Sequence, residues 1–197
     1  MKIKESSAAI IAGGESRRFG SPKYMAKFRG KMLIEYSIQL AQNLTDQLLL
    51  IANDPEFETT LKLPLFSDLI PNKGPLGGIL TALIKIQSDW LFVLPVDMPL
   101  LQPDIYFKLW QNRIDARPVV ARSSKGIESM VSLWHRSHQS FIEKLIQQDQ
   151  LKINLALKKL SAVEVHFGQQ SDLNFFNINF KDDIEKLEQI AGKQAFL

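Results

Sequence analysis

The segment AAIIAGGESRRFGSPKYMAKFRGK, residues 8–31, is the part of the chain that decides its fold class. It opens with a short apolar run that ends in two glycines, and Arg17, Arg18 and Lys23 follow closely. A short apolar run bounded by glycine predicts a strand that is buried on both faces. Glycine lets main-chain N–H groups approach a polyphosphate closely, and the cations offset phosphate charge. The segment therefore predicts either a phosphate-binding loop after a buried strand or a tight turn with solvated arginines.

Strands and helices are expected to alternate along the rest of the chain. The patterns predict strands over 7–13, 47–53, 90–97, 117–122, 129–135 and 162–167, with a short extended piece over 63–71. Helical spacing predicts helices over 31–44, 78–87, 103–113, 140–148, 152–160 and 179–191, with Asn179 as the N-cap of the last one. Such alternation is typical of parallel sheets with helical crossovers. We therefore predict one domain over residues 1–197, an α/β fold, as a three-layer α/β/α sandwich with a mostly parallel, Rossmann-like sheet.

The composition is that of an ordinary globular protein. The chain has 197 residues, of which 45% are hydrophobic and 23% charged. It contains no apolar run long enough to span a membrane, which takes about 18 residues or more. The basic and apolar amino end has a shorter apolar run than a signal peptide, so we interpret it as a first strand and expect a cytoplasmic protein.

Charge and cysteine content exclude several classes of site. The chain has no cysteine, so disulfides, thiolate metal sites and a cysteine nucleophile are excluded. Its net charge is +3 without a long basic block, which does not indicate a nucleic-acid surface and fits an anionic small molecule. His135 and His138 have i, i+3 spacing, so they could hold zinc from one helix face. The favoured interpretation is that both are polar residues on the surface.

Polar residues stand where predicted strands end. Ligands of such sheets bind beyond the carboxyl ends of the strands, so Asp97, at the end of the most apolar strand, is a candidate site residue. Asn53 ends another predicted strand, and Asp68 lies in the extended piece over 63–71. Mg²⁺ prefers oxygen ligands, commonly one or two carboxylates plus substrate phosphates, which suits Asp97 after the most apolar strand. The plainer alternatives are a turn residue for Asp68 and Asp97 and a strand-end cap for Asn53.

Several motifs carry a resemblance to a known family. AGGESRRFGSPK resembles the signature loop LAGGxSxRMGxDK of the NTP-transferase enzymes, and its GG form resembles the molybdenum cofactor guanylyltransferases, the MobA family. Phe19 replaces the usual Met of this loop, and Pro22 replaces the usual Asp. The resemblance implies a fold of the nucleotide-diphospho-sugar transferase type.

Further motifs of the same family follow in order, from residue 8 to about 187. They are LIAND (50–54), SDLIPNKGPLGGILTAL (67–83), FVLPVDMPLL (92–101) and FFNINFKDDIEKL (175–187). The likeness is weakest over 117–135, where Met130 stands near a usual proline.

The resemblance implies a role for each matched residue. It implies catalytic roles for Lys23, Arg18 and Asp97, with Mg²⁺ held by Asp97. It implies nucleotide contacts from Ile11, Ala12, Gly13, Gly14, Lys23, Asn53, Asp68 and Asp97. It implies acceptor contacts from Gly77, Gly78, Asn177 and Asn179, although the two asparagines could also serve only as caps.

The implied reaction is transfer of GMP from GTP to molybdopterin, with release of pyrophosphate. Its partners would be GTP, the molybdopterin cofactor and, transiently, cofactor-biosynthesis proteins or molybdoenzyme chaperones, without nucleic acid or membrane. Two alternatives stay open. One is a related cytidylyltransferase or sugar-phosphate nucleotidyltransferase, and the other is a nucleotide-binding protein without catalysis.

Overall fold

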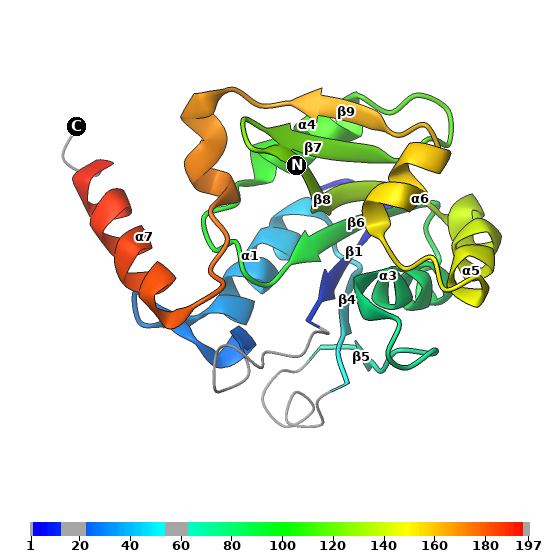
Figure 1. The fold of residues 1–197 in the computed structure, drawn as a ribbon, viewed down its shortest axis with the longest axis horizontal. Coiled ribbons are helices and arrows are strands. Elements are labelled where there is room, and N and C mark those ends of the chain that lie inside the picture. Colours follow the sequence, from blue (N-terminus) through cyan, green and yellow to red (C-terminus); the bar gives the residue numbers. More distant parts are fainter. Residues whose placement is uncertain (1, 13–22, 54–62, 195–197) are drawn as a thin grey trace.

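The first strand, β1 (Ser6–Ile11), lies in the interior of a mostly parallel sheet, between β4 and β6 (Figure 1). The computed structural model describes residues 2–12, 23–53 and 63–194, with side chains described up to residue 190. Within these residues the main sheet has seven strands in the order β5-β4-β1-β6-β8-β7-β9. A small second sheet pairs β2 (Lys27–Phe28) with β3 (Lys31–Met32).

The other strands of the main sheet place their carboxyl ends at one common edge, apart from β8. They are β4 (Leu48–Ile51), β5 (Leu65–Phe66), β6 (Trp90–Pro95), β7 (Val119–Ser123), β8 (Gly126–His135) and β9 (Val163–His166). The pairs β1–β4, β1–β6, β4–β5 and β7–β9 are parallel, whereas β8 is antiparallel to both β6 and β7. The prediction of a mostly parallel sheet is therefore confirmed.

Helices cover both faces of the sheet, and the strands are apolar on both faces for that reason. Along β1, Ala8 and Ile10 pack toward α1 (Leu33–Leu44) and α4 (Pro103–Gln111). Ala9 and Ile11 pack toward α3 (Gly74–Lys85), α5 (Gln139–Gln147) and α6 (Ile153–Lys159). Figure 1 shows α1 on one side of the strands and α3 with α5 on the other. The predicted three-layer α/β/α arrangement is confirmed.

A small third core holds the carboxyl-terminal part of the chain against the segment after the first strand. It consists of Phe28, Leu33, Ile178 and Leu187, all fully buried. Leu187 belongs to α7 (Lys181–Gln194), which follows the 3₁₀ helix η3 (Gln169–Phe175). Phe28 lies just after the 3₁₀ helix η1 (Lys23–Met25). This core therefore brings residues that are about 150 positions apart in sequence into one neighbourhood.

Three predicted helix starts are wrong by two residues or more. The first helix begins at Leu33 rather than at 31. The helix expected from residue 78 already begins at Gly74. Pro75 lies in the first turn of the helix, where its missing N–H leaves no hydrogen bond unmade. The last helix begins at Lys181 rather than at 179. Among the described residues, no helix is long and apolar enough to cross a membrane.

Candidate functional site

Three side-chain oxygens converge on the ammonium group of Lys23. Its Nζ donates to Oδ2 of Asp97 at 2.7 Å and to the Oδ1 atoms of Asn179 at 3.2 Å and Asn177 at 3.4 Å. The Lys23 side chain is 18% exposed and that of Asp97 is 22% exposed, so the ion pair is largely shielded from solvent. The structure therefore brings together four residues that the sequence analysis assigned to the site from three distant segments.

Asp97 and the two asparagines are also joined through the main chain. Asp97 lies two residues beyond β6, at the carboxyl edge of the sheet, and its carbonyl oxygen accepts a hydrogen bond from the Ile178 N–H at 2.9 Å. Ile178 is fully buried in the third core. Because neighbouring side chains of an extended segment point in opposite directions, burying Ile178 directs Asn177 and Asn179 away from that core.

Asp183 holds the entry to α7 in place. Its Oδ2 accepts the main-chain N–H groups of Asn179 and Phe180, each at 2.9 Å, and its Oδ1 accepts Lys186 Nζ at 3.2 Å. Burial raises the pKa of Asp183, but these hydrogen bonds outweigh burial and hold the pKa below its usual value. The predicted N-cap role of Asn179 is wrong, because the helix starts at Lys181 and the Asn179 side chain faces Lys23.

A second pair lies beyond the ends of β4 and β5. Asn53 Nδ2 donates to Asp68 Oδ2 at 2.9 Å, and the main-chain N–H of Asp68 donates to Asn53 Oδ1 at 2.8 Å. Burial raises the pKa of Asp68, and the Asn53 hydrogen bond partly opposes that rise. The other carboxylate oxygen of Asp68 is buried and has no hydrogen-bond partner among the described residues. An unpaired buried acceptor is uncommon in folded proteins and is a feature typical of a functional site.

The first turn of α3 lies directly against β1 and Asp68. A Cβ atom added to Gly78 would stand 2.9 Å from Ile11 Cγ2 and 3.5 Å from Asp68 Oδ1. At Gly77 the nearest atom would be Lys73 Cβ, at 3.0 Å. Gly78 therefore permits close packing of the helix on β1, whereas Gly77 leaves room for the Lys73 side chain and the main chain of Ile70 before the helix.

The residues assigned to the loop after β1 divide into two groups. Ile11 is buried at the end of β1, and the Ala12 N–H donates to the Ile51 carbonyl at 2.9 Å. The Ala12 amide thus extends the ladder between β1 and β4 in this structure. Gly13, Gly14 and Arg18 lie outside the described residues.

The two histidines considered for zinc do not form such a site. His138 ends the 3₁₀ helix η2 (Arg136–His138) and is only 6% exposed, so its interpretation as a surface residue is wrong. Its Nδ1 accepts the His135 N–H at 3.3 Å, while His135 Nδ1 pairs with Ser137 Oγ at 2.8 Å. Burial, reinforced by nearby His135, lowers the pKa of His138 to about 4. His138 is therefore a neutral structural residue.

The oxygens around Lys23 suit a hard divalent cation. In the part of the chain that the structure describes, no group of three or more His, Cys, Asp or Glu side chains could hold a metal ion. Mg²⁺ commonly uses one or two carboxylates and takes its remaining ligands from phosphates and water. A single carboxylate with neighbouring amide oxygens therefore fits Mg²⁺ brought with a phosphate ligand, and does not fit zinc.

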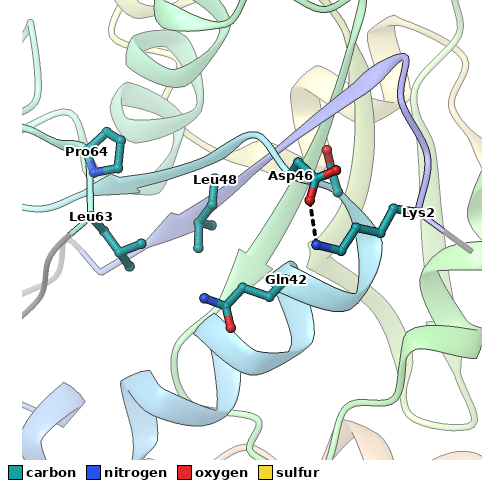
Figure 2. A pocket seen from close by; sticks show the side chains of 7 residues that line it. Lys2, Gln42, Asp46, Leu48, Leu63 and Pro64 are labelled. Carbon is teal, nitrogen blue, oxygen red and sulfur yellow. Dashed lines mark hydrogen bonds and ion pairs between the residues drawn. The ribbon is translucent and has the colours of Figure 1, made fainter.

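A pocket elsewhere on the molecule is distinct from this site. It lies between Lys2, Gln42, Thr45, Asp46, Leu48, Leu63 and Pro64, as Figure 2 shows for the labelled side chains. Lys2 and Asp46 pair across it at 2.5 Å. Leu48 begins β4, so the pocket lies toward the amino edge of the sheet, opposite to Asn53.

Some residues that shape the site were not predicted. Ile178 and Asp183 position the two asparagines, and the signals for them were an apolar residue between two asparagines and an acid in the first turn of a helix. Buried Thr81 joins the segment after β5 to α3, because its Oγ1 accepts the Leu69 N–H and donates to the Gly77 carbonyl, both at 3.0 Å. No sequence pattern pointed to Thr81.

Comparisons with known proteins agree with this geometry. The model of the family described as MobA-like NTP transferase domain matches residues 8–163. A protein of Natranaerobius thermophilus named "Probable molybdenum cofactor guanylyltransferase" is 30% identical over 198 residues, which cover 95% of this chain and 97% of the relative. A Geobacillus sp. protein of the same name is 27% identical and covers 94% and 99%.

Solved structures share the fold. Molybdopterin-guanine dinucleotide biosynthesis protein A from Archaeoglobus fulgidus has a TM-score of 0.80 at 24% identity, with 95% of this chain and 99% of that chain covered. CMP:2-keto-3-deoxy-manno-octonic acid synthetase in complex with CTP has a TM-score of 0.76 at 11% identity, with 96% and 99% covered. At these identities the likeness concerns the fold alone, and it confirms the predicted fold of the nucleotide-diphospho-sugar transferase type.

Proposed function

The chain belongs to the MobA-like NTP transferase family, and we propose that it transfers GMP from GTP to molybdopterin with release of pyrophosphate. The observation that carries the proposal is the cluster of Lys23 with Asp97, Asn177 and Asn179 at the carboxyl edge of the sheet. Ligands of open α/β sheets bind at this edge. The cluster offers a cation for phosphate and oxygens for a metal ion or a polar acceptor.

The chemistry needs positioning and charge neutralisation rather than a protein nucleophile. An oxygen of the terminal phosphate of molybdopterin forms a bond to the α-phosphorus of GTP, and the bond from that phosphorus to the pyrophosphate oxygen breaks. The acceptor supplies the nucleophile, so the absence of cysteine from the chain is no obstacle. Fixed positive groups near the phosphates stabilise the charge that develops during transfer.

Individual residues have proposed roles at the phosphates. Lys23 neutralises charge on the α-phosphate, and Arg18, outside the described residues, neutralises the departing pyrophosphate. Main-chain N–H groups of Gly13 and Gly14, also outside the described residues, would hold the nucleotide in register. Asp97 would hold Mg²⁺. Bound there, Mg²⁺ would supply charge neutralisation and a template for phosphate oxygens.

The base and acceptor ends of the site have separate candidates. Asn53 and Asp68 lie across β1 from Asp97 in the order of the sheet, and the unpaired Asp68 oxygen offers an acceptor for an N–H or O–H of the nucleoside. We place the acceptor beside Asn177 and Asn179 and near the first turn of α3, where Gly77 and Gly78 lie. The N-terminus of that helix favours negative charge, which suits a terminal phosphate.

The reaction itself tests the proposal. The protein is incubated with GTP labelled at the α-phosphate, Mg²⁺ and molybdenum cofactor, and product is followed as labelled dinucleotide and as pyrophosphate. Both products should appear together, and neither should form without acceptor. Binding of GTP without any pyrophosphate would favour a nucleotide-binding protein without catalysis.

Base specificity needs its own measurement. A ligand that binds only the folded state raises thermal stability, so GTP with Mg²⁺ should raise the melting temperature more than CTP, ATP or UTP at equal concentration. A larger shift with CTP would replace the guanylyltransferase assignment with a cytidylyltransferase.

The proposed reaction also indicates the compartment in which the protein acts and the proteins that it contacts. Supply of GTP and Mg²⁺ is cytoplasmic, so we place the reaction there. A dinucleotide cofactor must pass to the enzymes that use it, and we therefore propose transient contact with cofactor-biosynthesis proteins or molybdoenzyme chaperones.

A further inference from the structure

The group that Lys23 forms with its oxygen partners has the make-up of a cation site. Carboxylate and amide oxygens are ligands that Mg²⁺ and related ions prefer, and here one carboxylate and two amide oxygens face a single point. That point holds the Lys23 ammonium, at 2.7 Å from Asp97, 3.2 Å from Asn179 and 3.4 Å from Asn177. An ammonium group has three N–H donors and no acceptor, so it can satisfy several such oxygens at once.

The main chain that carries these oxygens is held independently of the lysine. The Ile178 N–H bonds to the Asp97 carbonyl, and buried Ile178 anchors the main chain between the two asparagines. Asp183 holds the Asn179 N–H at 2.9 Å. The three residues would therefore keep their places in the main chain, with their oxygens within reach of one ion, if the long, flexible Lys23 side chain moved away.

A divalent cation and this ammonium group cannot share the position. An ion bound to Asp97 Oδ2 would lie within a few ångströms of an ammonium that contacts the same oxygen. The repulsion is weakly screened, because both side chains are mostly shielded from solvent.

We propose that the Lys23 ammonium stands in for the divalent cation in the nucleotide-free protein and opposes its binding at Asp97. This inference rests on the proposed function, since the triphosphate supplies the oxygens that draw the lysine away. Metal and nucleotide then bind together. The phosphate becomes the new partner of Lys23, and the oxygens of Asp97, Asn177 and Asn179 become available to the ion. The free protein would hold divalent ions poorly.

Binding of Mn²⁺ alone tests the inference without any turnover. Free Mn²⁺ is measured by electron paramagnetic resonance during titration of the nucleotide-free protein. Lys23→Met removes the positive charge and should lower the Kd for Mn²⁺ at least about tenfold. The repulsion between an ammonium group and a divalent ion a few ångströms away in a shielded site exceeds the free energy that corresponds to a tenfold change in Kd. Lys27→Met is the matched control. It removes the same net charge from exposed Lys27 and should leave binding unchanged.

Two further variants keep the test decisive. Lys23→Gln retains N–H donors for the three oxygens and removes the charge, so it should also tighten binding if Lys23→Met unfolds. Adding Asp97→Asn to either variant should abolish the gain in affinity. The melting temperature of each variant checks its fold.

The outcomes separate this inference from the proposed function. Unchanged or weaker Mn²⁺ binding in both folded Lys23 variants, with binding lost in Asp97→Asn, would overturn the stand-in role and leave the metal site at Asp97 intact. Equal binding with and without the Asp97 carboxylate would overturn both, because the ion would lie elsewhere.

Discussion

Asp97 works through its side chain and its main chain at the same time. Its carboxylate pairs with Lys23 at 2.7 Å, while its carbonyl accepts the Ile178 N–H at 2.9 Å. Substitution of the side chain therefore removes the charge and leaves the main-chain contact to the carboxyl-terminal segment. This separation makes Asp97 a clean position for testing the chemistry.

Replacing Asp97 by Asn should lower kcat by about 100-fold or more and leave the fold unchanged, because the proposed Mg²⁺ site would lose its carboxylate ligand. The measurement is the rate of pyrophosphate release at saturating GTP, with the melting temperature as the check on folding. Asp89→Asn is the control, since Asp89 lies just before β6, at the strand end remote from Asp97. Full activity of the Asp97 variant would contradict the assigned role.

Buried His138 makes stability depend on pH. Its pKa falls from 6.5 to about 4 in the folded protein, so the unfolded chain binds the proton first as pH drops. The stabilisation is present above pH 6.5 and is lost progressively toward pH 4. Between pH 7 and pH 5 it should amount to about 2 kcal/mol of unfolding free energy.

Urea unfolding at the two pH values checks this expectation, with His138→Gln as the comparison. The variant should lose less stability on acidification than the natural chain. Equal losses would mean that His138 is not protonated preferentially in the unfolded state.

At the scale of elements, α7 contributes through its first turn. Asp183 accepts the Asn179 and Phe180 N–H groups, whereas Asp182 makes no described hydrogen bond through its side chain. Asp183→Asn should cost about 1 kcal/mol of unfolding free energy, the usual effect of losing a helix-end hydrogen bond. Chemical denaturation measures it.

Asp182→Asn is the matched control for Asp183→Asn. Both variants lose a negative charge near the start of α7, so their difference isolates the hydrogen bonds. If the two variants were equally stable, Asp183 would not hold the segment that carries Asn177 and Asn179.

The packing of α3 on β1 makes a second prediction about an element. Gly78→Ala places a methyl group 2.9 Å from Ile11 Cγ2, which is buried at the end of β1 and has little room to move. Gly77→Ala gains the same helix propensity but meets the Lys73 side chain, which lies at the helix start. Gly78→Ala should therefore be less stable than Gly77→Ala by about 1 kcal/mol or more. Equal thermal unfolding of the two variants would contradict this close approach.

The elements themselves were largely predictable from the sequence. Continuous apolar runs predicted β1, β4 and β6 well, because strands covered on both faces have no polar alternation to confuse the pattern. The two-residue strands of the β2–β3 ribbon were missed, since so short a segment has no period. The first part of β8 was also missed, because an irregular register between Val120 and Ala121 interrupts its pairing with β7.

The arrangement of the site was less predictable from physical pattern alone. The rule that ligands lie at the carboxyl ends of strands indicated Asp97, whereas Asn53 and Asp68 came from family resemblance. The assignment of Lys23, Asn177 and Asn179 came from family resemblance, because the Lys23 contacts span 74 to 156 residues in sequence. Such contacts depend on how the third core packs the carboxyl-terminal segment against the residues after β1. No local sequence pattern predicts that packing.

At the scale of the whole molecule, the sheet places two polar groups on either side of β1. Asn53 and Asp68 follow β4 and β5, and Asp97 with Lys23 lies beyond β6. In the proposed function, a nucleotide that spans this edge would place its base beside Asn53 and Asp68 and its phosphates beside Lys23 and Asp97. The pocket beside Lys2 and Asp46 lies toward the opposite edge and has no part in this arrangement.

A crystal structure with Mg²⁺ and a GTP analogue that cannot be cleaved between the α- and β-phosphates tests this account most directly. We expect the metal ion on Asp97, the α-phosphate beside Lys23, and the nucleoside next to Asn53 and Asp68. A triphosphate bound anywhere else, with Lys23 still paired to Asp97, would contradict it.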